Sequence, residues 1–128
     1  MILLDTCTLL WMMEGGAGLS SHARELIEDP SKPLYLSSIS AFEIAMKAQK
    51  KAIRLPQKTK KWFQQAVKMF GIQEIPVDSN ILLASVELPL LHRDPADRIL
   101  VATALQEELI LLTPDSWIKK YPQVRVEW

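Results

Sequence analysis

Four short hydrophobic runs recur along this chain, and each leads into an acidic residue or an acid-bearing helix. They are Ile2–Leu4, Leu34–Leu36, Leu88–Leu91 and Ile110–Leu112. The first stays apolar until Asp5, as expected for a strand that is covered on both faces of a sheet. Because strand-like segments alternate with helix-like ones, the sequence predicts an α/β fold with a mainly parallel central sheet flanked by helices.

Glycine, proline and capping residues set the expected order of elements. Gly15, Gly16 and Gly18 end the first helix, and Pro95 suits the first position of a late one. Strands are expected at residues 1–5, 34–37, 73–76 and 109–113, with an edge strand at 124–127. Helices are expected at residues 6–14, 20–28, 40–51, 59–70, 79–87 and 95–108, with a helical turn at 116–121. With 128 residues and 48% hydrophobic content, the chain fits one domain, residues 1–128.

Acidic residues are expected to meet at one edge of this sheet. Sites in such folds lie beyond the carboxyl ends of the strands, where Asp5 and Asp115 fall directly, while Glu43, Asp94 and Asp97 lie on first helical turns. Two unit charges about 4 Å apart cost on the order of 4 kcal/mol at an effective dielectric near 20, so such a cluster needs cations. Carboxylate oxygens suit Mg²⁺ or Mn²⁺, and ions held this way serve phosphate chemistry, which points toward a nuclease.

Each acid also has a local explanation. Asp5 and Asp115 suit helix N-caps, and Glu43 suits the last position of a capping box. Asp94 and Asp97 fall at the positive end of one helix dipole, but they repel each other and need a cation or a neighbouring arginine as partner. Capping geometry and metal reach are compatible, so both readings stay open for each acid.

The zero net charge hides an asymmetry. Residues 47–68 carry eight basic side chains and no acidic one, so the remaining chain has 7 basic and 15 acidic residues. A basic lobe near an acidic pocket would hold a polyanion against bound cations, whereas the alternative is two solvated helix faces. The basic residues of this stretch that we single out as RNA-binding candidates are Lys47, Lys50, Lys51 and Lys58.

Other catalytic groups are sparse. Cys7 is expected to be a small core residue and His22 to face solvent. His92, just before Asp94, is open to a substrate contact or a structural hydrogen bond, and the structural role is favoured. With no Cys or His cluster and no glycine-rich loop after a strand, neither a zinc site nor a phosphate loop is expected. The chain has no basic leader and no long apolar segment, which predicts a cytoplasmic protein without membrane association.

The ordered motifs of the chain resemble those of PIN-domain proteins of the VapC toxin type. The resemblance covers nearly the whole chain and is carried by Met1–Thr6, Ser37–Ala45 with Lys47, His92–Ala104 and Leu112–Asp115. No single piece is diagnostic, although the His92–Arg98 segment is fairly specific to one branch of these toxins.

This resemblance implies a Mg²⁺- or Mn²⁺-dependent endoribonuclease that is inhibited by a cognate antitoxin and is usually a homodimer. It implies that Asp5, Glu43 and Asp97 are the central acids and Asp115 the fourth, with Asp94 as an extra helper. Lys47 and the basic stretch after it would then hold RNA, and Trp62 and Phe63 could stack bases, although they are expected to be helix core.

Three alternatives come from other classes. A phosphatase would have a second acid two residues after Asp5, where Cys7 stands. A phosphoacceptor receiver would have paired acids after its first strand, so neither pattern is met. The third is a catalytically inactive PIN-like module that binds nucleic acid or protein. The apolar first helix, Leu9–Met13, is expected to be covered in part by another chain, unless the glycine-rich residues 15–18 cover it.

Overall fold

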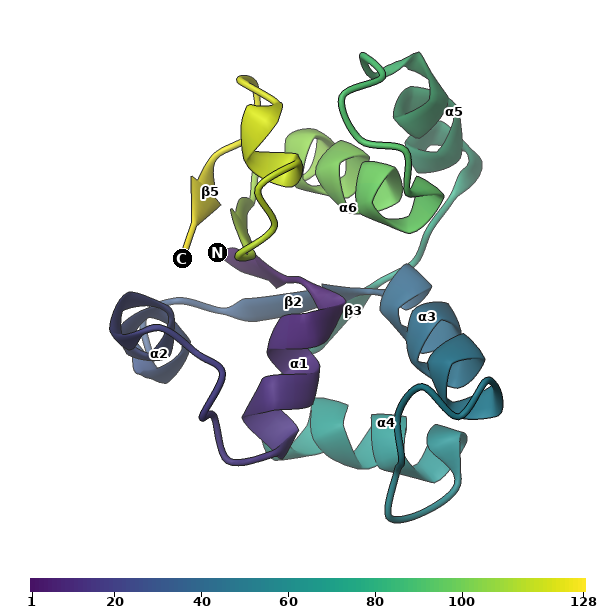
Figure 1. The fold of residues 1–128 in the computed structure, drawn as a ribbon. Helices are drawn as coiled ribbons and strands as arrows, with labels where there is room; N and C mark the ends of the chain where they lie inside the picture. The colour runs from purple at the N-terminus through teal and green to yellow at the C-terminus, as the bar shows by residue number, and fades with distance from the viewer.

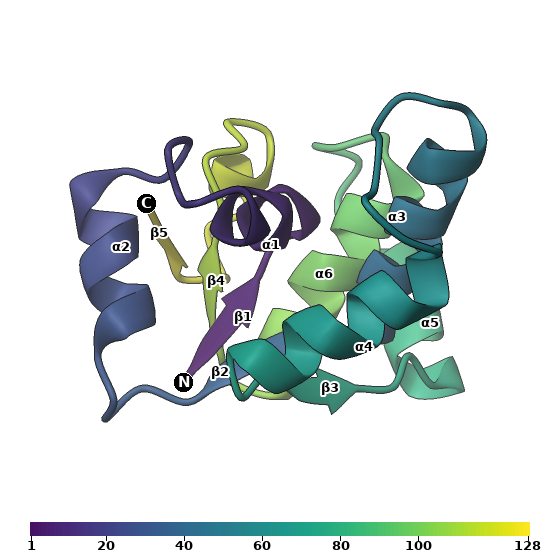
Figure 2. The ribbon, with the colours of Figure 1, turned by 90° about the horizontal axis from the view of Figure 1, so that it is seen from below.

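The computed structural model describes all 128 residues and has a five-stranded, all-parallel sheet with helices on both faces (Figures 1 and 2). The strand order is β3-β2-β1-β4-β5. The strands are β1 (Ile2–Leu4), β2 (Leu34–Ser37), β3 (Gln73–Ile75), β4 (Ile110–Leu112) and β5 (Val126–Glu127). The helices are α1 (Thr6–Met13), α2 (Ser21–Glu28), α3 (Ser38–Gln49), α4 (Thr59–Met69), α5 (Ser79–Glu87) and α6 (Pro95–Gln106), followed by the 3-10 turn η1 (Ile118–Lys120). The α/β prediction is confirmed.

Alternate side chains of the central strands enter two separate cores. Ile2 and Leu4 pack with residues of α1, α3 and α4, whereas Leu3 packs with α6 and the turn before β5. In Figure 1 these two helical layers lie below and above the sheet, and α2 lies at its side. Because β1 is buried on both faces, its sequence is continuously hydrophobic, as expected from the pattern.

One hydrophobic run does not form a strand. Leu88–Leu91 connects α5 to α6 as an irregular segment, and Leu90 is 75% exposed. The remaining three runs lie in β1, β2 and β4, which are adjacent in the sheet. Leu4 pairs with Leu36 on one side and with Leu112 on the other, so these three strands end in register.

The first helix is covered largely from within the chain. Leu9 and Met12 are buried, and the Trp11 ring lies 5.5 Å from that of Trp128. A Cβ atom at Gly18 would lie 2.5 Å from the Trp11 ring, so only glycine permits this close approach. The surface expected at α1 is therefore mostly closed by the glycine-rich segment, and the larger exposed apolar side chains lie elsewhere. No helix is both long and apolar enough to cross a bilayer.

Candidate metal centre

Strand register gathers the acidic side chains at one edge of the sheet. The residues that directly follow Leu4, Leu36 and Leu112 are Asp5, Ser37 and Thr113, and the Asp5 backbone N–H donates to the Leu112 carbonyl at 3.2 Å. Ser37 begins α3, which brings Glu43 to the same edge, and Thr113 begins the loop to Asp115. The carboxyl ends of three parallel strands therefore converge as predicted.

Asp97 lies at the centre of the resulting cluster. Its ligand atoms are within 4.8 Å of those of Glu43 and Asp94 in one group, and of those of His92 and Asp115 in another. Asp97 is the third residue of α6, whose helix begins with Pro95 as expected. Its side chain is only 12% exposed, so its charge is poorly solvated.

The pKa of Asp97 reports how closely the acids approach. Burial, followed by the negative charges of Asp5, Asp94, Glu43 and Asp115, raises the pKa of this carboxyl to about 8. All four other predicted acids therefore act on the same group. Without a bound cation, their mutual repulsion favours the protonated form of Asp97 at neutral pH.

Threonine hydroxyls orient two of the acids. Thr6 donates to Glu43 at 2.6 Å, and Thr113 donates to Asp5 at 2.5 Å. Burial raises the pKa of both carboxyls, against the effect of these hydrogen bonds. Asp5 belongs to neither of the two groups around Asp97, although its charge acts on both Asp97 and Glu43.

Two of the capping explanations fail. Asp5 occupies the N-cap position of α1, but its side chain makes no capping hydrogen bond. Helix α3 begins two residues earlier than expected, with Ser37 as its N-cap, so Glu43 lies beyond the first turn and cannot complete a capping box. Both carboxylates are instead directed to neighbouring strand ends.

The other two caps exist and leave oxygens for the cluster. Asp94 accepts a hydrogen bond from the Ala96 N–H at 3.0 Å and remains exposed. Asp115 uses Oδ1 to accept the N–H groups of Trp117 and Ile118, while its Oδ2 faces His92. Burial opposes ionisation of Asp115, but the N–H of Ile118 and the His92 ring outweigh it and hold its pKa below the ordinary value.

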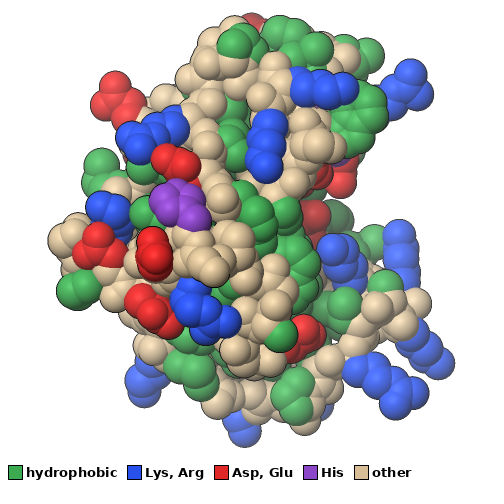
Figure 3. All heavy atoms as spheres, turned by 60° about the vertical axis from the view of Figure 1, so that its left-hand side comes forward, with side chains coloured by type: hydrophobic (Ala, Val, Ile, Leu, Met, Phe, Trp, Pro, Cys, Tyr) green, Lys and Arg blue, Asp and Glu red, His purple; other side chains and the backbone are tan.

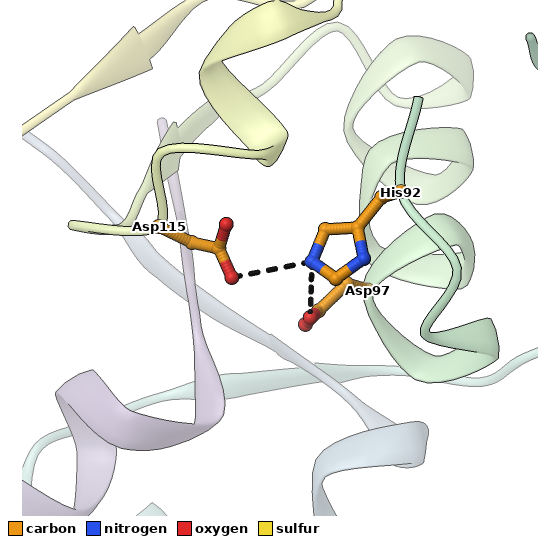
Figure 4. Close-up of side chains that lie close together, drawn as sticks. All are labelled: His92, Asp97 and Asp115. Atoms are coloured by element: carbon orange, nitrogen blue, oxygen red, sulfur yellow. Dashed lines mark hydrogen bonds and ion pairs between the residues drawn. The ribbon is translucent and has the colours of Figure 1, made fainter. Parts of the chain in front are cut away.

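His92 enters the cluster itself, which sequence reasoning did not identify. Its Nε2 lies 2.9 Å from Asp97 Oδ2 and 3.2 Å from Asp115 Oδ2 (Figure 4). Its Nδ1 accepts the Asp94 backbone N–H at 3.1 Å, so the ring proton of a neutral imidazole is on Nε2. In this tautomer His92 donates to the two carboxylates through Nε2.

Neither nearby arginine neutralises the acids. Arg93 and Arg98 make no ion pair within 4 Å, and the Arg98 guanidinium instead donates to backbone carbonyls of residues 85–92, including that of Leu88 at 2.8 Å. The Tyr121 hydroxyl accepts from the His92 N–H and donates to the Pro89 carbonyl. Arg98 and Tyr121 thereby fix the segment that carries His92.

The predicted RNA-binding lysines divide into two places. Lys47 and Lys50 line a depression of about 450 Å³ together with Glu43 and Asp94, so they lie beside the acids. Lys51 and Lys58 line a separate depression of about 490 Å³ at the α3–α4 connection. The structure therefore brings the first pair to the cluster but not the second.

Three further expectations are confirmed. Cys7 is a free thiol whose pKa is raised to about 12 by burial and the charge of Asp5, so it is not a thiolate nucleophile. His22 is exposed. Trp62 and Phe63 are 4% and 9% exposed and belong to the core, which removes them as base-stacking candidates.

The donor set fits a hard divalent cation. The two groups around Asp97 offer carboxylate oxygens from four residues, and the charge of Asp5 acts on them, while the one imidazole donates through Nε2 and the nearby Cys7 is protonated. Oxygen-only ligation suits Mg²⁺ or Mn²⁺ and disfavours zinc.

Comparisons with known proteins agree with this architecture. The family model described as PIN domain matches residues 2–124. Ribonuclease VapC22 of Mycobacterium tuberculosis is 29% identical over 125 residues, 97% of this chain and 94% of that protein.

Solved structures give the same fold. VapBC2 from Rickettsia felis, bound to a DNA fragment from its promoter, matches with a TM-score of 0.68 and 18% identity, covering 99% of this chain and 98% of that one. A toxin-antitoxin complex from Klebsiella pneumoniae matches with a TM-score of 0.67 and 20% identity, covering 97% of this chain and 95% of that one.

The repulsion around Asp97 predicts how stability depends on pH. A carboxyl whose folded-state pKa is about 8 instead of 3.8 favours folding less and less as the pH rises from about 4 to 8. In excess chelator at pH 8, Asp97→Asn should therefore be more stable than the wild type by about 1 kcal/mol or more. At pH 4 the advantage should largely disappear. Chemical denaturation at both pH values measures it, and an Asp97→Asn protein less stable at pH 8 would contradict the assignment.

Proposed function

The chain belongs to the PIN-domain family, and we propose that it is a metal-dependent endoribonuclease and the toxin of a toxin–antitoxin pair. The observation that carries this proposal is the convergence of four acids on Asp97 without any arginine or lysine partner. The similarity to a ribonuclease along nearly the whole chain supports RNA as the substrate. The alternative is a catalytically inactive PIN-like module that binds nucleic acid or protein.

We assign the catalytic and metal-binding roles to Asp5, Glu43, Asp97 and Asp115, with Asp94 as an additional metal ligand. When bound, Mg²⁺ or Mn²⁺ would supply an activated water and offset charge on the leaving oxygen of a phosphodiester. Thr6 and Thr113 hold Glu43 and Asp5 in place, which limits the reorganisation needed on binding. His92 keeps its Nε2 proton directed at Asp97 and Asp115 and so offsets part of their repulsion.

The lysines give the site a route for the RNA backbone. Lys47 and Lys50 stand beside Glu43 and Asp94, where they can hold phosphates close to the acids, and Lys51 and Lys58 extend the basic surface along the α3–α4 connection. On the face turned to the viewer in Figure 3, acidic and basic side chains are mixed over most of the surface, and basic ones project together at the lower right.

Partners follow from the relatives and from exposed apolar surface. Toxin–antitoxin complexes share this fold, which supports a cognate antitoxin, and the cytoplasm is the proposed compartment because RNA is there. A homodimer contact is better supported at α5 than at α1, because Leu82, Leu83 and Val86 of α5 are 45%, 65% and 78% exposed.

Cleavage should require both the cation and the acids. Purified protein free of antitoxin should cleave single-stranded RNA with Mg²⁺ or Mn²⁺ and stop when a chelator is added. Asp5→Asn and Asp97→Asn should each lose most of the activity, about 100-fold or more, while remaining folded. Asp78→Asn is the matched control, because asparagine still caps α5 and Asp78 does not belong to the grouped acids. Chelator-resistant cleavage, or full activity in both variants, would favour another mechanism or the binding module.

The lysine route predicts a change in salt dependence. Each lost phosphate contact should reduce the slope of log K against log salt by roughly 0.7 for a single strand. We expect Lys47→Ala with Lys50→Ala to weaken binding and flatten this slope, and Lys51→Ala with Lys58→Ala to act in the same direction. Lys32→Ala, at the opposite edge of the sheet before β2, is the control. Slopes that match the wild type in all variants would mean that these lysines are only solvated.

The α5 surface predicts self-association. Sedimentation of the wild type should show a dimer, and Val86→Glu should shift it toward the monomer because a charge would be buried at the contact. Glu87→Gln, next in sequence, controls for a change on the same helix end. A wild type that remains monomeric at micromolar concentration would remove the dimer from the proposal.

A further inference from the structure

Trp117 is a large aromatic side chain that the fold leaves 52% exposed beside the acid cluster. The other tryptophans serve the core: Trp62 is buried, and Trp11 and Trp128 pack on each other. Exposure of so large an aromatic side chain to water is unfavourable, so its position next to a candidate active site indicates a role in binding.

A cavity lies between Trp117 and the segment that leads into α6. Its volume is about 540 Å³, and it is lined by Trp117 and residues 90–94. The His92 ring centre is 6.5 Å from that of Trp117, and the two rings are tilted by 56°. Because the same His92 ring contacts Asp97 and Asp115 through Nε2, the cavity directly adjoins the acid cluster.

The position of Trp117 is tied to the chemistry of the site. Its backbone N–H donates to Asp115 Oδ1 at 2.7 Å, while Oδ2 of the same carboxylate faces His92. The next residue, Ile118, is fully buried and anchors η1 in the core. The backbone that carries the indole ring is therefore fixed, which lowers the entropic cost of binding a ligand against the ring.

Cations frame the ring and the cavity. Lys120 Nζ lies over one face of the Trp117 ring, 3.9 Å from its centre, in a cation–π contact, and the exposed Arg93 lines the cavity. Neither residue makes an ion pair within 4 Å. An exposed aromatic with cations over and beside it is a combination that binds single-stranded nucleic acid, whereas the centres of protein interfaces are depleted of charge.

We propose that Trp117 is the stacking platform of a nucleobase subsite beside the acid cluster. An unpaired RNA base near the phosphate to be cleaved enters the cavity and stacks on the indole face that Lys120 does not cover, and Arg93 and Lys120 hold the adjoining backbone. The substrate class rests on the proposed ribonuclease function, but the stacking contact does not depend on cleavage.

Binding without cleavage tests the subsite. In an Asp5→Asn background, fluorescently labelled oligoadenylate and oligouridylate are compared with oligonucleotides of the same length that carry abasic positions. Trp117→Ala should weaken binding of the base-containing strands by roughly 5- to 150-fold, the range for one lost base–aromatic stack, and Trp117→Phe should retain most of the affinity. Binding of the fully abasic strand should be unchanged by either substitution. Met69→Ala, which removes an exposed apolar side chain from α4, is the control.

The outcomes separate this proposal from the proposed function. Equal affinities for Trp117→Ala and its parent would overturn the subsite, and altered sedimentation with unchanged RNA affinity would assign Trp117 to a protein contact instead. Base-dependent binding lost in Trp117→Ala supports the subsite even if the wild type proves unable to cleave RNA. In an active wild type, Trp117→Ala should also raise KM or shift the preferred cleavage positions more than it lowers kcat.

Discussion

Electrostatic repulsion among carboxylates at the ends of β1, β2 and β4 is the interaction on which this site depends. Three in-register strands and the segments after them bring Asp5, Glu43 and Asp115 to one edge, and the start of α6 adds Asp94 and Asp97, of which Asp97 is buried from water. This arrangement does not stabilise the fold, because burial and the neighbouring negative charges raise the pKa of Asp97 to about 8 and so disfavour its ionised form. Carboxyls with such a raised pKa cluster at functional sites, and here a bound cation would relieve the repulsion.

Neutral hydrogen-bond donors keep the cluster in place without neutralising it. Thr6 and Thr113 orient two carboxylates, and His92 bridges two others. Arg98, the cation nearest in sequence to Asp97, is occupied by the carbonyls that end α5, and it holds the His92 segment from behind. Arg98 therefore binds backbone carbonyls and not the acids, so the acids depend on an external cation for charge compensation.

The sequence predicted the elements and the gathering of the acids because both follow from local patterns: buried strands that are wholly hydrophobic, and acids just after them. It missed contacts that depend on tertiary direction. Whether Arg98 faces Asp97 or the α5 carbonyls cannot be read from adjacency, and the His92 contact with Asp115 spans 23 residues. Helix α3 also starts at Ser38 instead of Ser40, so Glu43 does not fall at the capping-box position, which depends on where the helix begins. Likewise, the cover that Gly18 gives Trp11 is a matter of packing, not of helix amphipathicity.

If the acids form one cation site, an ion can be located there. Crystals grown with Mn²⁺ would give an anomalous difference map at the manganese edge. We expect a strong peak in contact with Asp97 and at least two of the carboxylates of Asp5, Glu43, Asp94 and Asp115. A well-ordered cluster at saturating Mn²⁺ with no peak among these residues would contradict it.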